Sequence, residues 1–359
     1  MPFRQRYTGL INKYRDRLPV HDDTRIISLG EGNTPLIRLN NIPGLTGKDV
    51  DIYVKYEGLN PTGSFKDRGM TMAVTKAVEE GSEAIICAST GNTSAAAAAY
   101  AARAGITAFV LIPEGKIAMG KLSQAMMHGS VVIQIKGNFD DGMKLVKEIG
   151  EEVPVTIVNS INPYRLQGQK TAAFEIVEEL EAAPDYHCLP VGNAGNITAH
   201  WMGYDEYYQQ GIVSKRPKMV GYQASGSAPF MRGEMVDDPD TVATAIRIGH
   251  PQSWDKAWKV KEESGGWFDE CTDDEILAAQ KLLAEKEGVF CEPASATSLA
   301  GALRDIATGK IEEGSKIVCT LTGHGLKDPD TAIKQAGSEI ISVDAKLDAV
   351  KKAILDNLN

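Results

Sequence analysis

The amino-acid sequence predicts an α/β fold made of open, mostly parallel sheets flanked by helices. Short apolar runs alternate along the chain with amphipathic stretches, a pattern typical of strands joined by crossover helices. The chain has 359 residues, which is more than one hydrophobic core usually supports, so two domains are expected. Its hydrophobic content of 43% is ordinary for a globular protein and excludes disorder over the whole chain.

Eight apolar runs are expected to form buried strands, most of them followed by a helical pattern. They are residues 52–56, 84–88, 108–112, 131–135, 155–158, 187–191, 219–223 and 317–321. In such sheets ligands bind where loops leave the carboxyl ends of the strands. The loops after these runs are therefore where functional residues are expected.

Helix signals agree with this scheme. Asn92, Thr93 and Ser94 offer capping side chains before an alanine-rich helix that should stop at Gly105. Acidic residues at 273–275 predict the start of another helix, because negative charge is favourable at a helix N-terminus. Residues 345–358 carry an apolar stripe and are expected to pack as a terminal helix.

The domain boundary has to be placed from the grouping of the strands, because no obvious linker is present. We expect a large cofactor-binding domain of residues 1–55 plus 155–359 and a smaller mobile domain of residues 56–154.

Composition excludes several classes of protein. The net charge of −10 argues against nucleic acid as a partner, because no basic field is available to attract phosphates. The longest apolar run, residues 95–102, is far too short to span a membrane, and residues 1–7 do not resemble a secretory signal. The five cysteines are scattered, so buried free thiols in a reducing cytoplasm are expected. The histidines form no metal-like pair, so no metal is expected.

The first candidate functional loop, residues 60–69, follows a strand and precedes a helix. It contains Lys66, which would lie near a helix start at the edge of the sheet. The ordinary explanation is a solvated surface lysine. The functional alternative is a lysine that forms a Schiff base with a carbonyl compound, which needs a lowered pKa and a dry pocket.

Two further loops also join strands to helices. Residues 89–94 supply hydroxyls, an amide and backbone N–H groups, which could receive a carboxylate, although a helix cap alone would use some of them. In residues 190–196, Gly192 and Gly195 should let the backbone turn tightly so that its N–H groups can hold a phosphate. The glycine spacing does not match the dinucleotide fingerprint. A fourth loop, residues 321–328, follows the last strong strand and by itself indicates only a glycine-rich turn.

Together these loops resemble the fold type II pyridoxal phosphate enzymes, the tryptophan synthase β-like family, and within them the threonine synthase branch. The resemblance runs from about Gly30 to the last glycine loop. Its most specific motifs are EGNTPL at 31–36, GSFKDR at 63–68, STGNT at 89–93, GNAGN at 192–196 and LTGHGLKD at 321–328. Related enzymes usually carry a more glycine-rich phosphate loop, so the two asparagines in the GNAGN motif favour this branch.

The resemblance implies two domains with the active site in the cleft between them, and a role for each loop. Lys66 would form a Schiff base with pyridoxal 5'-phosphate and then act as acid and base. Asn92 would bond the ring hydroxyl of the cofactor, and Thr322 would meet its pyridine nitrogen. The cofactor phosphate would be held by Gly192, Asn193, Ala194, Gly195 and Asn196.

The substrate implied is O-phospho-L-homoserine, which carries a carboxylate and a phosphate. Ser89, Thr90 and Thr93 would bind the carboxylate. Arg165 would grip the phosphate through two parallel hydrogen bonds, with Asn159 and Ser160 as neutral donors. The ordinary alternative for this last group is a helix start with a surface arginine.

The implied activity is that of a carbon–oxygen lyase acting on phosphates. It converts O-phospho-L-homoserine and water to L-threonine and phosphate, the last step of threonine biosynthesis. Closure of the smaller domain would exclude water. A cytoplasmic homodimer is also implied. Whether Lys116, Lys121, His324 or Lys327 touches the substrate stays open.

Three alternatives remain. A serine/threonine dehydratase or a cysteine synthase would use the same cofactor scaffold. A nicotinamide-dependent dehydrogenase lacks support, because the spaced triple glycine and the acidic residue that follows it are missing. A catalytically inactive binding protein is disfavoured by the joint presence of Lys66, Asn92 and Thr322.

Overall fold

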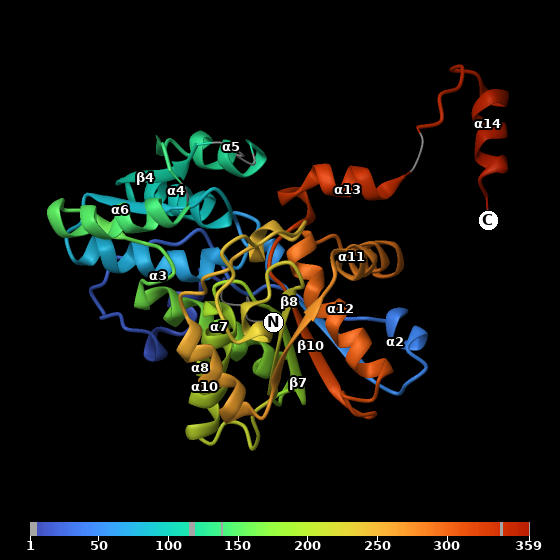
Figure 1. The fold of residues 1–359 in the computed structure, drawn as a ribbon, viewed down its shortest axis with the longest axis horizontal. Helices are drawn as coiled ribbons and strands as arrows, with labels where there is room; N and C mark the ends of the chain where they lie inside the picture. Colours follow the sequence, from blue (N-terminus) through green and yellow to red (C-terminus); the bar gives the residue numbers. More distant parts are fainter. Residues whose placement is uncertain (1–5, 115–118, 138, 338–339, 359) are drawn as a thin grey trace.

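The computed structural model describes residues 6–114, 119–137, 139–337 and 340–358. Within this part of the chain the strands form two separate sheets, with helices on their faces (Figure 1). In spatial order, the larger sheet contains β1 (Leu36–Arg38), β2 (Asp51–Tyr56), β10 (Lys316–Leu321), β7 (Tyr186–Pro190), β8 (Lys218–Ala224) and β9 (Trp267–Cys271). The smaller sheet contains β5 (Val131–Ile135), β4 (Thr107–Pro113), β3 (Ala84–Ala88) and β6 (Thr156–Ile157).

The described α-helices range from four residues, in α1, α2 and α9, to 18 residues in α7. The α-helices are α1 (Leu10–Lys13), α2 (Ile42–Leu45), α3 (Lys66–Glu79), α4 (Asn92–Ala104), α5 (Met119–Met127), α6 (Phe139–Glu152), α7 (Pro163–Leu180), α8 (Gly195–Gln209), α9 (Pro229–Arg232), α10 (Trp254–Ser264), α11 (Asp273–Glu287), α12 (Pro293–Ala307), α13 (Pro329–Ala336) and α14 (Leu347–Asp356). Single 3₁₀ turns occur at Arg15–Arg17, Glu57–Leu59, Thr244–Ile246 and Gly325–Lys327.

The predicted α/β fold is confirmed. All strand pairs are parallel except β1 with β2, which pair antiparallel. Each of the eight expected strands forms, with ends within one residue of those predicted. Sequence reasoning missed β1 and β9. β1 is only three residues long, and β9 is half-buried with two acidic residues, so neither is a continuous apolar run.

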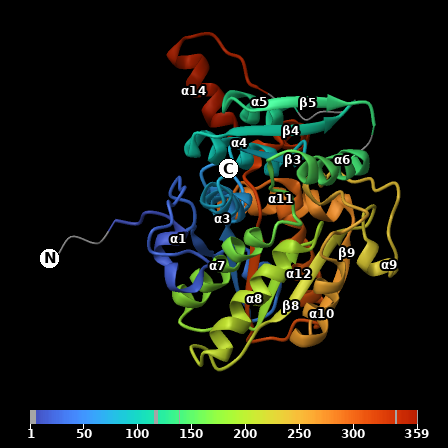
Figure 2. The same ribbon diagram turned by 90° about the vertical axis from the view of Figure 1, so that its left-hand side faces the viewer.

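Helices cover both faces of each sheet, as expected for parallel strands (Figure 2). In the larger sheet, α12 packs on β7, β8 and β10, while α8 and α10 pack against β8. In the smaller sheet, α4 packs on β3 and β4, and α6 contacts β3, β4 and β6. The smaller sheet extends to β6, a few residues beyond the boundary expected at residue 154.

The predicted helix ends are largely confirmed. The acidic cluster begins α11, where Thr272 and Glu275 form a capping box. Helix α4 ends at Ala104, and Gly105 follows in the left-handed conformation with φ 78°. The expected side-chain cap of α4 is wrong: Gly91 is its N-cap, and no side chain bonds the free N–H groups there.

The terminal helix forms, but the prediction that it packs is wrong. None of the residues in α14 is buried, and its apolar stripe, including Leu347 and Leu355, faces solvent. In Figure 1 the helix stands away from the body of the molecule. An amphipathic period predicts that a helix has an apolar face but does not say what covers that face.

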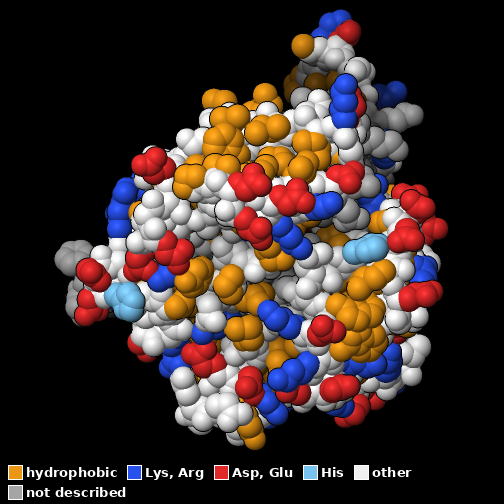
Figure 3. Space-filling model, turned by 60° about the vertical axis from the view of Figure 1, so that its left-hand side comes forward, with side chains coloured by type: hydrophobic (Ala, Val, Ile, Leu, Met, Phe, Trp, Pro, Cys, Tyr) orange, Lys and Arg blue, Asp and Glu red, His pale blue; other side chains and the backbone are white. Residues whose placement is uncertain are grey.

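A second exposed apolar area lies on the smaller sheet. Its edge strand β5 leaves Val131 and Ile133 exposed, and Met126 and Met127 of α5 are exposed as well. Figure 3 shows hydrophobic side chains gathered across the upper part of one face of the molecule. No helix in the described residues is long and apolar enough to cross a membrane.

Candidate active site

A cavity of about 580 Å³ lies among the loops that leave the strands. It is lined by residues that follow β3 and β6 of the smaller sheet and β7 and β10 of the larger one. The fourteen residues singled out from the sequence all line it: Lys66, Ser89, Thr90, Asn92, Thr93, Asn159, Ser160, Arg165, Gly192, Asn193, Ala194, Gly195, Asn196 and Thr322. The carboxyl ends of the strands therefore bring these distant segments together, as the fold class predicts.

Lys66 is the first residue of α3, and its side chain lines the cavity. The amine lies 4.3 Å from the centroid of the Phe65 ring. Burial and the nearby positive charge of Arg165 lower the pKa of Lys66 to about 7, while Glu292 acts in the opposite direction. A lysine of this kind carries an unprotonated, nucleophilic amine near neutral pH. The place of Lys66 in the cavity wall favours the functional alternative over an ordinary solvated lysine.

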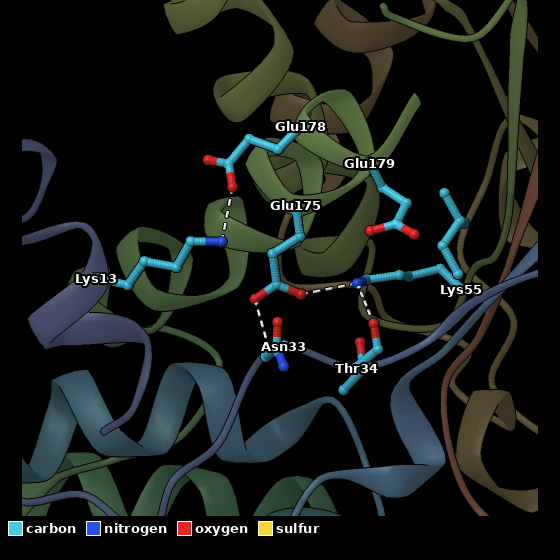
Figure 4. Close-up of a pocket in the computed structure, with 8 residues that line it drawn as sticks. Lys13, Asn33, Thr34, Lys55, Glu175, Glu178 and Glu179 are labelled. Atoms are coloured by element: carbon cyan, nitrogen blue, oxygen red, sulfur yellow. Dashed lines mark hydrogen bonds and ion pairs between the residues drawn. The ribbon is translucent and has the colours of Figure 1, made fainter. Parts of the chain in front are cut away.

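A buried ionic network anchors the first turn of α3 behind Lys66. Arg68 is 1% exposed and donates to Glu57 at 2.6 Å and to Glu175 at 2.6 Å. Lys55 of β2 donates to Glu175 at 2.7 Å, and Figure 4 shows this contact together with the bond from the backbone of Asn33. The network joins the first turn of α3 to β2 and α7.

The loop of residues 89–94 lines the cavity with Ser89, Thr90, Asn92 and Thr93, while Ser94 donates to the carbonyl of Gly91 at 2.7 Å. No side chain caps α4, so the first N–H groups of this helix donate no bond to a capping side chain. The hydroxyls of Thr90 and Thr93 therefore do not serve as helix caps. Ser89 accepts a local bond from the N–H of Gly91 at 3.1 Å. The arrangement presents hydroxyls and a helix N-terminus to the cavity, which suits a carboxylate.

The loop of residues 192–196 turns into α8 without a side-chain cap. Its left-handed residue is Ala194, with φ 61°, so the expectation that the two glycines make the turn is wrong. Gly192 has a different reason to be small: a Cβ there would lie 3.0 Å from the backbone of Ile246. The uncapped start of α8 and the helix dipole are suited to binding an anion.

Arg165 is buried in the cavity wall, which excludes a surface arginine. It is 2% exposed, and its Nη1 donates to the carbonyl of Val158 at 3.2 Å. Burial lowers the pKa of Arg165 to about 10, and the guanidinium remains charged at neutral pH. Asn159 pairs through both amide atoms with the backbone of Ala88, at 3.0 and 2.9 Å. That pairing leaves one Nδ2 hydrogen of Asn159 for a ligand.

Thr322 lies directly after β10, and its hydroxyl is 2.9 Å from the hydroxyl of Ser295 on α12. Ser295 also accepts from the N–H of Gly323 at 2.9 Å. Its own hydrogen is therefore available to Thr322 or to the carbonyl of Gly323, and the Thr322 hydroxyl is held in one place. A neutral hydroxyl of this kind can share a hydrogen bond with a ring nitrogen without supplying a counter-charge.

Several buried polar atoms of cavity-lining residues have no hydrogen-bond partner. Leaving such an atom unpaired costs about 1–3 kcal/mol, so a group of them indicates a polar ligand. They are Asn92 Oδ1, Arg165 Nε, Gln169 Oε1, and Oδ1 and Nδ2 of Asn196. This set fits a cofactor and a substrate that together bring hydroxyl, carboxylate and phosphate groups.

Sequence reasoning missed other residues of the cavity. Gln169 lies one helical turn after Arg165 on α7, and this i, i+4 spacing could have indicated it. Glu292 and the segment around residues 236–252 gave no recognisable signal. His324 does not line the cavity, and Lys327 donates to Gln124 at 2.5 Å. Lys116 and the side chain of Lys121 lie outside the described residues.

Comparisons with known proteins identify the family of the chain. A family model described as "Pyridoxal-phosphate dependent enzyme" matches residues 27–323. A threonine synthase of Synechocystis sp. is 57% identical over 97% of this chain and 91% of its own length. One of Mycobacterium tuberculosis is 60% identical over 93% of this chain and 92% of its own. The structure of maize serine racemase superposes with a TM-score of 0.75 at 22% identity, covering 92% of this chain and 97% of that one.

The chain therefore belongs to the pyridoxal-phosphate-dependent enzymes, and its fold is that of their type II members. Within them it is a member of the threonine synthase family, with relatives of that name at 51–60% identity over most of the chain. The resemblance in the sequence motifs is thus confirmed.

Proposed function

We propose that the fourteen cavity residues carry out the threonine synthase reaction on O-phospho-L-homoserine, with Lys66 as the residue that binds the cofactor covalently. The observation that carries this proposal is the pairing, in one cavity, of a lysine with a pKa of about 7 and a buried arginine whose Nε has no partner. The lysine suits the cofactor, and the arginine suits a phosphate leaving group.

The residues present fit pyridoxal 5'-phosphate. The start of α8 at Ala194 would hold its phosphate, with the unpaired amide of Asn196 beside it. Asn92 would meet the ring hydroxyl, and Thr322 the ring nitrogen. When bound, the cofactor withdraws electrons from the carbon atoms near the substrate's amino group, which makes their protons removable.

The substrate's two anions find different receptors in the cavity. Ser89, Thr90 and Thr93 offer neutral donors and a helix N-terminus for the carboxylate. Arg165 offers a charged donor for the phosphate, and Asn159 and Ser160 line the same cavity as neutral donors. Because Arg165 is already buried and held by the carbonyl of Val158, its donors are in place before the phosphate leaves.

Lys66 is the residue that moves protons. Its pKa of about 7 lets the amine both accept and return a proton near neutral pH, so one group can serve as base and acid at the substrate's carbon atoms. Burial and then repulsion from Arg165 lower the pKa of this amine, and Arg165 would also stabilise the negative charge of the departing phosphate.

The proposal is tested by measuring phosphate and threonine in one reaction with purified, cofactor-loaded protein. Equal amounts of both products from O-phospho-L-homoserine are expected. Arg165→Ala should keep the visible absorption of the bound cofactor but lose turnover. His128→Ala, at an exposed position just after α5, is the control and should retain both. Faster turnover of L-serine or L-threonine would instead favour the dehydratase alternative.

The proposal also covers the domain organisation, the cellular compartment and the oligomeric state of the protein. The protein works as a large domain of residues 1–55 plus 155–359 and a mobile domain of residues 56–154, which closes over the cavity. The separate sheets and the cavity among their loops support this. The protein acts in the cytoplasm, and the buried free cysteines found among the described residues support a reducing compartment.

The protein is also proposed to be a homodimer. The exposed apolar stripe of α14 and the exposed apolar residues of β5 support this, because a monomer would leave both areas in water.

A further inference from the structure

Glu292 is a buried carboxylate of the cavity that the proposed mechanism does not use. It is 1% exposed and lines the cavity together with Lys66 and Arg165. It stands at the N-cap of α12, but its side chain makes no capping hydrogen bond. Helix capping therefore does not explain why a glutamate occupies this position.

The surroundings of Glu292 hold its carboxylate in one orientation. Asn92 donates from Nδ2 to Glu292 Oε1 at 3.1 Å. The backbone N–H of Glu292 donates to the carbonyl of Gly323 at 3.1 Å. A Cβ at Gly323 would lie 2.4 Å from Glu292 Oε1, so a larger residue there would displace the carboxylate from this position.

The hydrogen bond to Glu292 decides which end of the Asn92 amide is left for a ligand. Because Nδ2 donates to the carboxylate, the buried Oδ1 has no partner and is left for a ligand together with at most one Nδ2 hydrogen. An amide flip would place Oδ1 against the carboxylate, and two acceptors would then repel each other. The orientation of Asn92 toward the cofactor is therefore set by Glu292.

The charge of Glu292 also acts on Lys66. Two charged groups influence the Lys66 amine: Arg165 on α7 lowers its pKa, and Glu292 at the start of α12 raises it. The third neighbour is the neutral ring of Phe65. Without Glu292, burial and Arg165 would both act against the protonated amine, and nothing would oppose them.

We propose that Glu292 is a positioning residue of this site: it fixes the orientation of the Asn92 amide and places a negative charge in the cavity that holds Lys66 and Arg165. It acts on the reaction through those residues. This inference rests on the proposed function, because Asn92 and Lys66 are assigned there as contacts of the cofactor.

Two variants separate the effect of the negative charge of Glu292 from the effect of its side-chain length. Glu292→Gln keeps the size of the side chain but loses the charge. Glu292→Asp keeps the charge but is one carbon shorter and cannot reach Asn92 in the same way. Glu312→Gln, at an exposed glutamate, is the matched control. Neither Glu292 variant removes a helix cap, so both should fold.

The first measurement is the pH dependence of Lys66 labelling in cofactor-free protein, followed by mass spectrometry of the labelled peptide. In the wild type the labelling midpoint should lie near pH 7. Glu292→Gln should lower it by about one pH unit, because removal of a neighbouring negative charge disfavours the ammonium form. Glu292→Asp and Glu312→Gln should leave it nearly unchanged. An unchanged midpoint in Glu292→Gln would refute the electrostatic role.

The second measurement is the visible spectrum of the protein loaded with pyridoxal phosphate. Glu292→Asp should shift the absorption maximum and weaken cofactor affinity, as Asn92→Ala should, because the amide is no longer oriented. A wild-type spectrum and affinity in Glu292→Asp would refute the positioning role.

A third measurement distinguishes failure of this inference from failure of the proposed function. Bound pyridoxal phosphate should protect Lys66 from labelling in the wild type. If bound pyridoxal phosphate does not protect Lys66 from labelling, the assignment of Lys66 as the cofactor-binding lysine is overturned. The labelling midpoints of the cofactor-free variants would still decide the electrostatic role of Glu292.

Discussion

Arg68→Met should destabilise the protein strongly, because Arg68 is the centre of a fully buried ionic network. The wild-type guanidinium bonds both Glu57 and Glu175 at 2.6 Å. After the substitution Lys55 still neutralises Glu175, at 2.7 Å, but Glu57 is left without its principal charge partner. Removing one partner of a buried pair costs about 3–5 kcal/mol, which is a large part of the stability of a typical domain.

The loss should depend on pH. In the wild type the pKa of Glu57 is lowered: burial alone would raise it, and the charge and hydrogen bonds of Arg68 outweigh that effect. A carboxylate whose folded pKa is lowered stabilises the protein above its unfolded pKa, and this contribution is lost as the pH falls. In the variant, burial raises the pKa of Glu57 instead, so stability should fall as the pH rises from about 5 to 8.

The assay is equilibrium unfolding in urea at pH 7.5 and pH 5.5, followed by circular dichroism of the cofactor-free protein. Arg38→Met is the matched control, because Arg38 forms an ion pair with Asp51 at the surface and should be replaceable with little effect. A second substitution, Glu57→Gln, should recover much of the loss in Arg68→Met, because it removes the buried charge. The reasoning is refuted if Arg68→Met lies within about 1 kcal/mol of wild type at pH 7.5, or if its loss is equal at both pH values.

Three other predictions concern the site and the surface. The first concerns the rate at which cofactor-free protein acquires the visible absorption of bound cofactor. This rate should rise about tenfold per pH unit below the Lys66 pKa of about 7 and level off above pH 8. A rate that still rises at pH 9 would contradict that pKa. Thermal unfolding should show that Gly192→Ala is destabilised, because its Cβ would press on the backbone of the facing loop, whereas Gly195→Ala has ordinary contacts and should match wild type. Leu347→Glu combined with Leu355→Glu should convert a dimer to a monomer in light scattering, since both side chains are exposed on α14; an unchanged mass would exclude this helix from the interface.

The arrangement of the strands could be predicted from the sequence to a large extent. Buried parallel strands are continuous apolar runs, and each expected run became a strand. The short or polar edge strands β1 and β9 could not be found in this way, because their residues are only partly buried and carry little hydrophobic signal.

The candidate site was also accessible from sequence, because its loops have recognisable motifs and a parallel sheet brings the ends of its strands to one edge. The fourteen residues expected from those loops share one cavity. Gln169 was missed although it follows Arg165 by one helical turn. Glu292 follows no predicted strand, so only its packing against Asn92 and Gly323 reveals it.

By itself the sequence determined the fold class, the order of most strands and helices along the chain, the family, and the loops that line the cavity. These follow from local hydrophobic period and from motifs, which are properties of neighbouring residues. Only the tertiary structure decided the burial and the electrostatic environment of the side chains in these loops. The pKa of Lys66, the burial of Arg165 and the ionic network around Arg68 each depend on charges and surfaces contributed by residues far away in the chain. The exposure of α14 also depends on the tertiary structure. The apolar stripe of this helix could be buried only against a partner surface, which the sequence of the helix does not specify.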